Sequence, residues 1–218
     1  MKTFTELVMK GGRGNVAFWA PVAAEIMCRV LLVPGSLRAA STNLAVLRTA
    51  LTIWPHAVLF EGLGSLPLFN PDLDTPPTPP TAAELRDQIH QSSAILFCTP
   101  EYAGALPGAF KNLLDWTIGD DHPRSLYEKP VGWLNARPHG AIEAHAELRR
   151  VLGYAHARIV EEACLEVPVT SSLVGDDGLI ADGPTRELIR AALVALCSSS
   201  AELDGRSRPP PAELPPVL

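Results

Sequence analysis

Short apolar runs alternate along the chain with stretches in which apolar residues recur at helical spacing. The runs are rich in Val, Ile, Leu and Phe, are bounded by Pro, Gly or polar residues, and are too short for helices. They predict five strands, at residues 28–33, 57–60, 94–98, 131–134 and 158–169. The helical spacing predicts helices at 41–53, from 81 onward, and at 107–116, 142–154 and 184–203. Strands and helices therefore alternate through most of the sequence.

This alternation defines the expected fold class. Each predicted strand is apolar on both faces, which favours a parallel sheet covered by helices on either side. Five such strands fit a flavodoxin-like α/β three-layer sandwich, with a five-stranded parallel sheet of order 2-1-3-4-5. In that order the winding reverses between strands 1 and 3, and ligands bind at the carboxyl ends of these two strands. The residues that follow strands 1 and 3 are therefore the first candidates for function.

One domain, at 27–204, accounts for all these elements. Residues 1–26 do not continue the pattern and are predicted to be an N-terminal extension, either upstream of the natural start or packed as an arm on a neighbour. Residues 205–218 are rich in Pro and are expected to be disordered. No stretch approaches the roughly 20 apolar residues of a membrane span, and no signal peptide is evident. A cytoplasmic protein is expected.

Composition narrows the possible functions. The 218 residues are 47% hydrophobic and 19% charged, with a net charge of −6 and no long basic run, which argues against a nucleic-acid or anionic-membrane surface. The cysteines, Cys28, Cys98, Cys164 and Cys197, are widely spaced and form no CxxC pair. They are predicted to be buried reduced thiols, with an incidental redox role as the alternative. His122 is assigned to a solvated turn, and no metal site is predicted.

The loop after strand 1 reads Gly-Ser-Leu-Arg-Ala-Ala-Ser-Thr-Asn over residues 35–43. It leads into a helix N-terminus, whose free N–H groups and dipole favour an anion. Hydroxyl, amide and guanidinium donors there suit a terminal phosphate; they are Ser36, Arg38, Ser41, Thr42 and Asn43. The alternative is an ordinary turn with Ser41 or Thr42 as the helix cap and Arg38 in solvent. The loop matches neither a GxGxxG nor a Walker A pattern, which favours a mononucleotide.

The loop after strand 3 is rich in Pro and Gly between residues 99 and 108. Such a backbone allows a flat ligand to approach closely, and Tyr102 could stack beside it. Glu101 is assigned a structural role at a loop turn or subunit boundary in preference to general-base catalysis, because the chemistry of a bound cofactor needs positioning more than an acid or a base. Lys111 and Asp115 are placed to form an i,i+4 ion pair, and Trp116 is expected in the core or an interface.

The two segments GSLRAASTN and PEYAGALPGAFKNLLDW together resemble the NADPH-dependent FMN reductase family, which includes chromate, quinone and azo-dye reductases. The resemblance spans about residues 27–196. It implies an enzyme with FMN as cofactor, NADPH or NADH as co-substrate, and a homodimer or homotetramer with the flavin near a subunit interface. It also implies that the phosphate-loop residues above hold the FMN phosphate. The ring would be lined by Pro100, Glu101, Tyr102, Ala103 and Gly104.

The sequence departs from the family pattern in two places. Relatives often have Asn where this chain has Ala103, so one polar contact to the flavin is in doubt. After strand 4 the family shows small residues and glycines, whereas this chain has Ala136, Arg137 and His139. Arg137 and His139 would contact the flavin or a nicotinamide phosphate, or face solvent. Ala136 and Arg137 are kept as candidate cofactor-binding residues.

The expected activity is hydride transfer from a nicotinamide nucleotide through FMN to a small acceptor, such as a flavin, quinone, azo dye or metal oxyanion. No catalytic acid, base or nucleophile is assigned. Two alternatives remain at this point. One is a flavin-binding electron carrier without turnover, and the other is a flavin-less structural or regulatory relative, suggested by the altered loop after strand 4.

Overall fold

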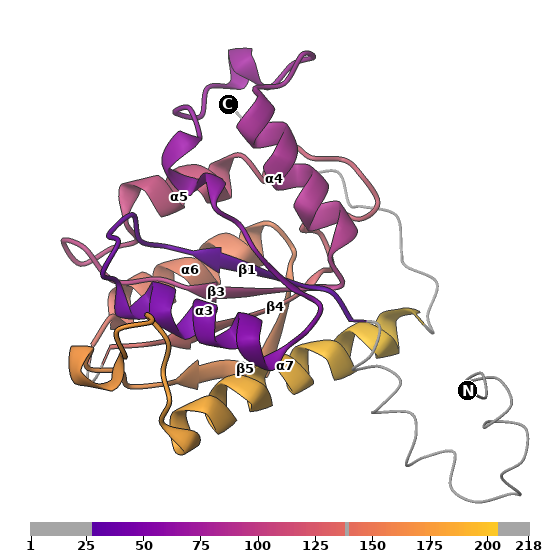
Figure 1. The fold of residues 1–218 in the computed structure, drawn as a ribbon. Helices are drawn as coiled ribbons and strands as arrows, with labels where there is room; N and C mark the ends of the chain where they lie inside the picture. The colour runs from indigo at the N-terminus through magenta and orange to yellow at the C-terminus, as the bar shows by residue number, and fades with distance from the viewer. Residues whose placement is uncertain (1–27, 138–139, 205–218) are drawn as a thin grey trace, which may run out of the picture.

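Five parallel strands form the central sheet in the order β2-β1-β3-β4-β5, as predicted (Figure 1). The computed structural model describes residues 28–137 and 140–204. The strands are β1 (Val30–Pro34), β2 (Ala57–Leu59), β3 (Ala94–Cys98), β4 (Pro130–Asn135) and β5 (Arg158–Glu166). The predicted extension at 1–26 and tail at 205–218 lie outside the described residues.

Helices cover both faces of the sheet (Figure 1). They are α3 (Thr42–Ile53), α4 (Pro80–Gln91), α5 (Gly108–Asp115), α6 (Ile142–Tyr154) and α7 (Gly183–Asp204). Three short 3₁₀ turns, η1 (Gly62–Ser65), η2 (Pro71–Leu73) and η3 (Ser171–Leu173), lie in the connections. None of the described helices combines the length and apolar character needed to cross a bilayer.

The hydrophobic core has two halves, one on each side of the sheet. Successive side chains of a strand point to opposite faces, so Val30 and Leu32 pack with α3 and α7, whereas Leu31 and Val33 pack with α4, α5 and α6. All four side chains are buried, as are all residues of β3 and β4, so the prediction that the strands are apolar on both faces is confirmed for these three. It was wrong for β5, in which Glu161 and Glu162 are exposed.

Some predicted boundaries were wrong at helix starts. Helix α4 begins at Pro80, one residue before the predicted start, and Pro79 occupies the N-cap position. Helix α5 begins at Gly108, one residue after the predicted start, because Pro107 is its N-cap. In both places a proline, whose fixed φ suits the helix entrance, occupies the N-cap position. The fifth strand ends at Glu166, three residues before the predicted end.

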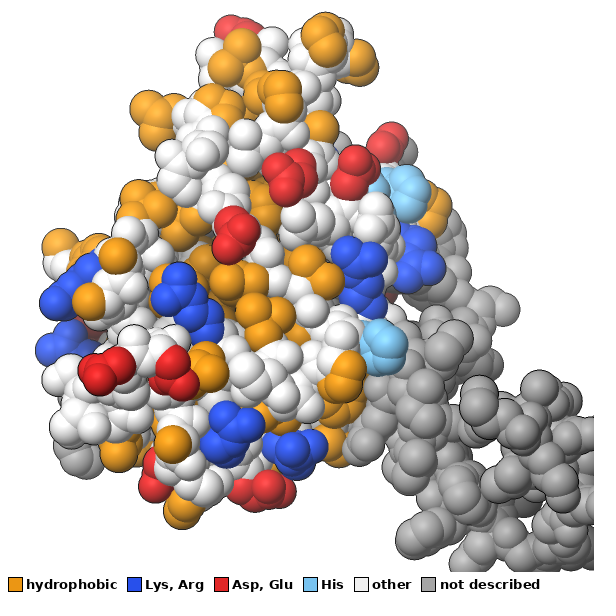
Figure 2. All heavy atoms as spheres, viewed as in Figure 1, with side chains coloured by type: hydrophobic (Ala, Val, Ile, Leu, Met, Phe, Trp, Pro, Cys, Tyr) orange, Lys and Arg blue, Asp and Glu red, His pale blue; other side chains and the backbone are white. Residues whose placement is uncertain are grey.

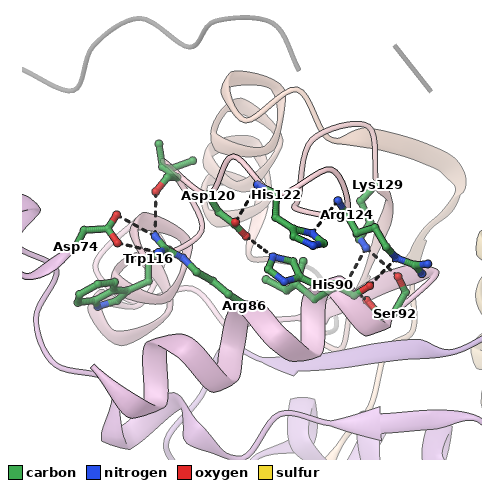
Figure 3. Close-up of polar contacts among 11 residues, drawn as sticks. Asp74, Arg86, His90, Ser92, Trp116, Asp120, His122, Arg124 and Lys129 are labelled. Carbon is green, nitrogen blue, oxygen red and sulfur yellow. Dashed lines mark hydrogen bonds and ion pairs between the residues drawn. The ribbon is translucent and has the colours of Figure 1, made fainter. Parts of the chain in front are cut away.

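A line of polar contacts joins α4 to the segment between α5 and β4 (Figure 3). Arg86 forms two hydrogen bonds to Asp74, of 2.8 and 2.9 Å, and donates to the Trp116 carbonyl oxygen at 3.0 Å. At the end of α4, the buried Lys129 ammonium donates to the carbonyl oxygen of Ile89 at 2.7 Å. These contacts give hydrogen-bond donors to backbone carbonyl oxygens that the helix and the loop would otherwise leave without a partner.

His122 lies in an exposed, capped turn, as predicted. Its backbone N–H donates to Asp120 Oδ1 at 3.2 Å, and its ring stacks on His90 with the centroids 3.9 Å apart. His90 Nε2 lies 2.7 Å from Asp120 Oδ2 (Figure 3). Within the part of the chain that the structure describes, no group of three or more His, Cys, Asp or Glu side chains is arranged to hold a metal.

The prediction of reduced cysteines was wrong for two of the four. Cys28, just before β1, forms a disulfide with Cys197 of α7, with the Cα atoms 5.7 Å apart. The other two, Cys98 and Cys164, are free thiols, and burial raises the pKa of Cys164 to about 11. The two paired cysteines are 169 residues apart in sequence, so no local motif could indicate that they meet.

Candidate flavin site

The loops after β1 and β3 start side by side at the carboxyl edge of the sheet. Pro34 is in register with Cys98, and the next residue, Gly35, donates its N–H to the Cys98 carbonyl oxygen at 2.8 Å. A Cβ atom at Gly35 would lie 2.2 Å from Thr99 Oγ1, so a side chain there would drive the loops apart. The two segments that the sequence nominated therefore form neighbouring walls of one site, as a mononucleotide requires.

The N-terminus of α3 is open to an anion. Ser41 occupies the N-cap position in an extended conformation, but its side chain makes no capping hydrogen bond, and the first turn carries no acidic residue. Ser41 is therefore the N-cap residue, as predicted, but its hydroxyl does not accept a hydrogen bond from the first turn. The N–H groups of the first turn and the helix dipole favour a phosphate at this position. The chain's own residues thus fit the phosphate of FMN.

The remaining residues of the phosphate loop are arranged in different ways. Ser36 is buried, and its Oγ accepts the Arg38 N–H at 3.2 Å, which shapes the turn. The Arg38 side chain is exposed at the mouth of the loop. Asn43 is buried, and its Oδ1 accepts the thiol hydrogen of Cys98 at 3.3 Å. Burial raises the pKa of Cys98, so the thiol stays protonated and able to donate.

The loop after β3 folds into a tight turn. Tyr102 and Ala105 exchange two backbone hydrogen bonds of 3.1 Å, and the two residues between them have positive φ, 52° at Ala103 and 71° at Gly104. Two consecutive positive φ angles match a type I′ turn. The Tyr102 side chain is 52% exposed, and Ala103 and Gly104 are also exposed, whereas Pro100 and Glu101 are half-buried. The turn presents backbone groups and one aromatic ring to a ligand.

Two carboxylates join this loop to α6. Glu101 Oε2 accepts the backbone N–H groups of Glu143 and Ala144, at 3.0 and 3.1 Å, and so caps a helix whose own N-cap residue is an alanine. In return, Glu147 Oε2 on α6 accepts the Leu106 N–H at 2.8 Å. We call these two contacts the carboxylate clamp. Glu101 is thus a structural residue at a loop turn, in agreement with the prediction.

The loop after β4 forms the third wall. Asn135 donates its side-chain amide to the Gly140 carbonyl oxygen at 2.8 Å and accepts the Arg137 N–H at 3.1 Å. The Arg137 side chain is exposed. Ala136 is completely buried, so its side chain packs in the core and presents no surface to a ligand. His139, the other unusual residue of this loop, lies outside the described residues.

Several contributors to the site were not predicted. Glu147 holds the backbone of a distant segment, Asn135 holds the backbone of its own loop, and Cys98 was treated only as a core thiol. His145 of α6 is also buried: its Nδ1 lies 2.6 Å from the Ala141 carbonyl oxygen, while Nε2 has no hydrogen-bond partner among the described residues. Burial lowers the pKa of this imidazole. In the sequence, only the glycine directly after β1 indicated how the site is arranged, because a glycine there permits the close approach of the two loops.

Other predictions for α5 are confirmed. Lys111 and Asp115 form the expected i,i+4 ion pair, and Trp116 is fully buried. Asn112 has a further role, because its side chain donates to the Pro67 carbonyl oxygen at 2.9 Å and accepts the Phe69 N–H at 2.7 Å. These hydrogen bonds hold the segment after β2 against α5, the helix that follows the loop after β3.

A flavodoxin-like sheet with an uncapped helix N-terminus after β1 and a tight turn after β3 defines a protein that binds a mononucleotide at the point where the winding reverses. Residues 28–170 match the family model described as NADPH-dependent FMN reductase, and the chain belongs to this family.

Known relatives agree with this assignment. The chain is 30% identical over 171 residues to an NAD(P)H-dependent FMN reductase of Pseudomonas aeruginosa, covering 77% of this chain and 92% of the relative. It is also 30% identical to a quinone reductase of Pseudomonas putida, covering 74% and 89%. Among solved structures, the flavoenzyme NAD(P)H:(acceptor) oxidoreductase FerB of Paracoccus denitrificans aligns with a TM-score of 0.63 and 25% identity, covering 80% of this chain and 98% of that one.

Proposed function

We propose that this protein is an FMN-dependent NAD(P)H oxidoreductase that reduces quinone-type acceptors. The observation that carries the proposal is the pairing of an open α3 N-terminus with the adjoining turn after β3, since these two features can hold the phosphate and the ring of one FMN. The family match and the names of the relatives supply the nicotinamide nucleotide and the acceptor class.

When bound, FMN supplies the redox chemistry, taking hydride from the nicotinamide and passing two electrons to the acceptor. The net reaction is NAD(P)H + H⁺ + quinone → NAD(P)⁺ + hydroquinone. The chain's residues bind and orient. Arg38 and the α3 N–H groups would neutralise the phosphate and the Tyr102–Ala105 turn would border the ring, while the carboxylate clamp fixes that turn against α6.

Two measurements, FMN uptake and oxidation of the nicotinamide nucleotide, distinguish the enzyme from an electron carrier and from a flavin-less relative. We expect the purified protein to take up added FMN, with the change in absorption that accompanies binding, and then to oxidise NADPH or NADH in the presence of a quinone. FMN uptake without turnover would favour the electron carrier. A protein that fails to take up FMN would favour the flavin-less relative.

The phosphate assignment is tested by Arg38→Ala. We expect FMN binding to weaken by about 1.5–3 kcal/mol, because a charged hydrogen bond to phosphate is lost. Arg150→Ala removes the same charge from the exposed surface of α6 and is the control. The dissociation constant can be measured by quenching of flavin fluorescence. An Arg38→Ala dissociation constant equal to that of the control would show that Arg38 does not bind the phosphate.

We further propose a homodimer or homotetramer in the cytoplasm. Hydrophobic side chains gather over the segment after β2, at the top of the molecule in Figure 2, and Leu68 there is 82% exposed while Leu73 is 46% exposed. Exposed apolar surface of this kind favours association. Sedimentation equilibrium at micromolar concentration tests the assembly, with a monomer as the contrary result, and cell fractionation tests the location.

A further inference from the structure

A pocket of about 270 Å³ lies beside the phosphate loop, on the flank of α3. One wall is the first two turns of α3 and the residues just before it, and the other is the segment between β5 and α7, at residues 171–178. Figure 2 shows a basic side chain over α3 and acidic side chains over this segment. The volume is below the roughly 300–1,000 Å³ of pockets that enclose a whole drug-sized ligand, so it suits one end of a longer molecule.

The pocket lining includes hydrogen-bond donors that form no hydrogen bond with another described side chain, and two of these residues, Ser41 and Thr42, are shared with the phosphate loop. Ser41 is only 9% exposed, yet its hydroxyl has no hydrogen bond to any described residue. Arg48 extends along the pocket from the second turn of α3, and its guanidinium has no ion pair within the described part of the chain. Thr42 and Ser171 add two further hydroxyls to the lining. Hydroxyl donors and one cation in the same lining favour an anionic oxygen ligand.

The wall opposite α3 is held in place. The Ile180 N–H donates to Thr49 Oγ1 at 3.0 Å, and Arg186 donates to the Ile180 carbonyl oxygen at 3.2 Å. Gly178, with φ of 75°, turns the backbone beside Arg48; a Cβ atom there would lie 3.5 Å from Arg48 Nη1. The Arg48 side chain is exposed at the edge of the pocket, and its guanidinium lies beside this backbone.

We propose that this pocket binds the 2′-phosphate and ribose at the adenosine end of NADPH, with Arg48 as the residue that selects NADPH over NADH. The inference rests on the proposed function, since a nucleotide that gives hydride to FMN must place its adenosine end away from the ring. The pocket adjoins the phosphate loop through Ser41 and Thr42, so a ligand there lies next to the flavin site.

Arg48 and Asp176, the two charged residues of the lining, are expected to have opposite effects on the preference for NADPH over NADH. A guanidinium binds a phosphate monoester through paired N–H donors. NADPH carries such a monoester on its adenosine ribose, and NADH does not. Asp176, also in the lining, accepts from a ribose hydroxyl but repels a phosphate. Arg48 therefore favours NADPH, and Asp176 limits that preference.

The test is steady-state kinetics of the FMN-loaded protein with saturating quinone. We expect Arg48→Gln to raise the KM for NADPH about tenfold, the effect of one lost charged hydrogen bond, while the KM for NADH and kcat change less than about twofold. Asp176→Asn should lower the KM for NADPH. Arg150→Gln, with the same charge change on α6 across the sheet, is the control and should leave both KM values unchanged.

Direct binding supplies a second readout that does not depend on turnover. By calorimetry on the FMN-loaded protein, 2′-AMP should bind more tightly than 5′-AMP, and Arg48→Gln should abolish the difference. Inorganic phosphate that binds as tightly as 2′-AMP, and equally in the variant, would indicate a free-phosphate site and overturn the proposal. Weaker FMN binding in Arg48→Gln would also overturn it, because the pocket would then belong to the flavin phosphate.

Failure of the proposed function gives a different result. In that case the FMN-loaded wild-type protein would oxidise neither nucleotide, and the calorimetric comparison of 2′-AMP with 5′-AMP would still decide the assignment of the pocket. If both nucleotides are oxidised and the ratio of their KM values is the same in Arg48→Gln and Arg150→Gln, the proposed function stands and the pocket assignment is wrong.

Discussion

The backbone conformation at Ala103 shows what the departure from the family pattern costs in stability. The residue has φ of 52°, in the left-handed region that costs an ordinary L-residue about 1–2 kcal/mol. Asparagine, which the family resemblance leads us to expect here, is one of the few side chains that tolerates this region. An asparagine at this position would therefore suit the turn itself as well as any contact with the flavin, and alanine lacks the first of these advantages.

We expect Ala103→Gly to increase the free energy of unfolding by about 1 kcal/mol, because glycine adopts positive φ without strain. Urea denaturation followed by tryptophan fluorescence measures the change. Ala105→Gly, in the same turn at a residue without positive φ, is the matched control and should lower stability. Equal effects of the two substitutions would mean that the left-handed backbone at Ala103 carries no strain.

Residue types in the site could be predicted from the sequence, but the directions of side chains could not. The hydroxyls, the arginine and the glycine after β1 are visible in the loop sequence because their chemistry is local. Asn43 illustrates the limit, since its carboxamide oxygen accepts from Cys98, which is 55 residues away in sequence. Only the packing of β3 against α3 brings those two groups together.

At the scale of elements, the carboxylate clamp makes α6 part of the flavin site. The bounds of α6 were predicted correctly from its apolar spacing, at Ile142–Tyr154. Its cap was not predicted, because the N-cap residue is Ala141 and the capping oxygen belongs to Glu101, about 40 residues earlier in the chain. Sequence rules for helix starts search neighbouring residues and miss a cap supplied from another loop.

We expect Glu101→Gln to lower the free energy of unfolding by about 1 kcal/mol, since the neutral amide interacts less favourably with the α6 N-terminus. Hydrogen exchange should also become faster at the Glu143 and Ala144 amides, which donate to the carboxylate. Glu143→Gln removes the same charge from the first turn, where the side chain is exposed, and serves as the control. Unchanged exchange at both amides in Glu101→Gln would contradict the capping role.

At the scale of the whole molecule, the strand order follows from local patterns because each βαβ unit is a right-handed crossover between parallel strands. The disulfide between Cys28 and Cys197, by contrast, does not follow from local sequence patterns. It joins the start of β1 to α7 through the half of the core that α3 and α7 share. A pairing across 169 residues has no signature in composition or spacing, and the absence of CxxC motifs led to the wrong prediction.

We expect Cys28→Ser to lower the free energy of unfolding by about 2–5 kcal/mol under oxidising conditions, because the unfolded chain regains the freedom that a long covalent loop removes. Urea denaturation with and without a thiol reductant measures the effect. Wild-type protein and the control Cys164→Ser, which removes a free thiol and keeps the disulfide, should both lose stability on reduction, whereas Cys28→Ser should not respond to the reductant. A wild-type protein indifferent to reductant would show that the bond contributes no stability. In a reducing compartment the pair would be two thiols.

The disulfide also encloses every strand and all three walls of the flavin site in one covalent ring, from residue 28 to residue 197. A protease that cuts once within this ring cannot release a fragment of it, since both new ends remain attached through sulfur. A nicked enzyme would keep its apparent mass without reductant and separate into two pieces only when the thiols are restored. The long proline-rich connection after β2 could thus be cut while the two loops that would hold FMN stay on one molecule.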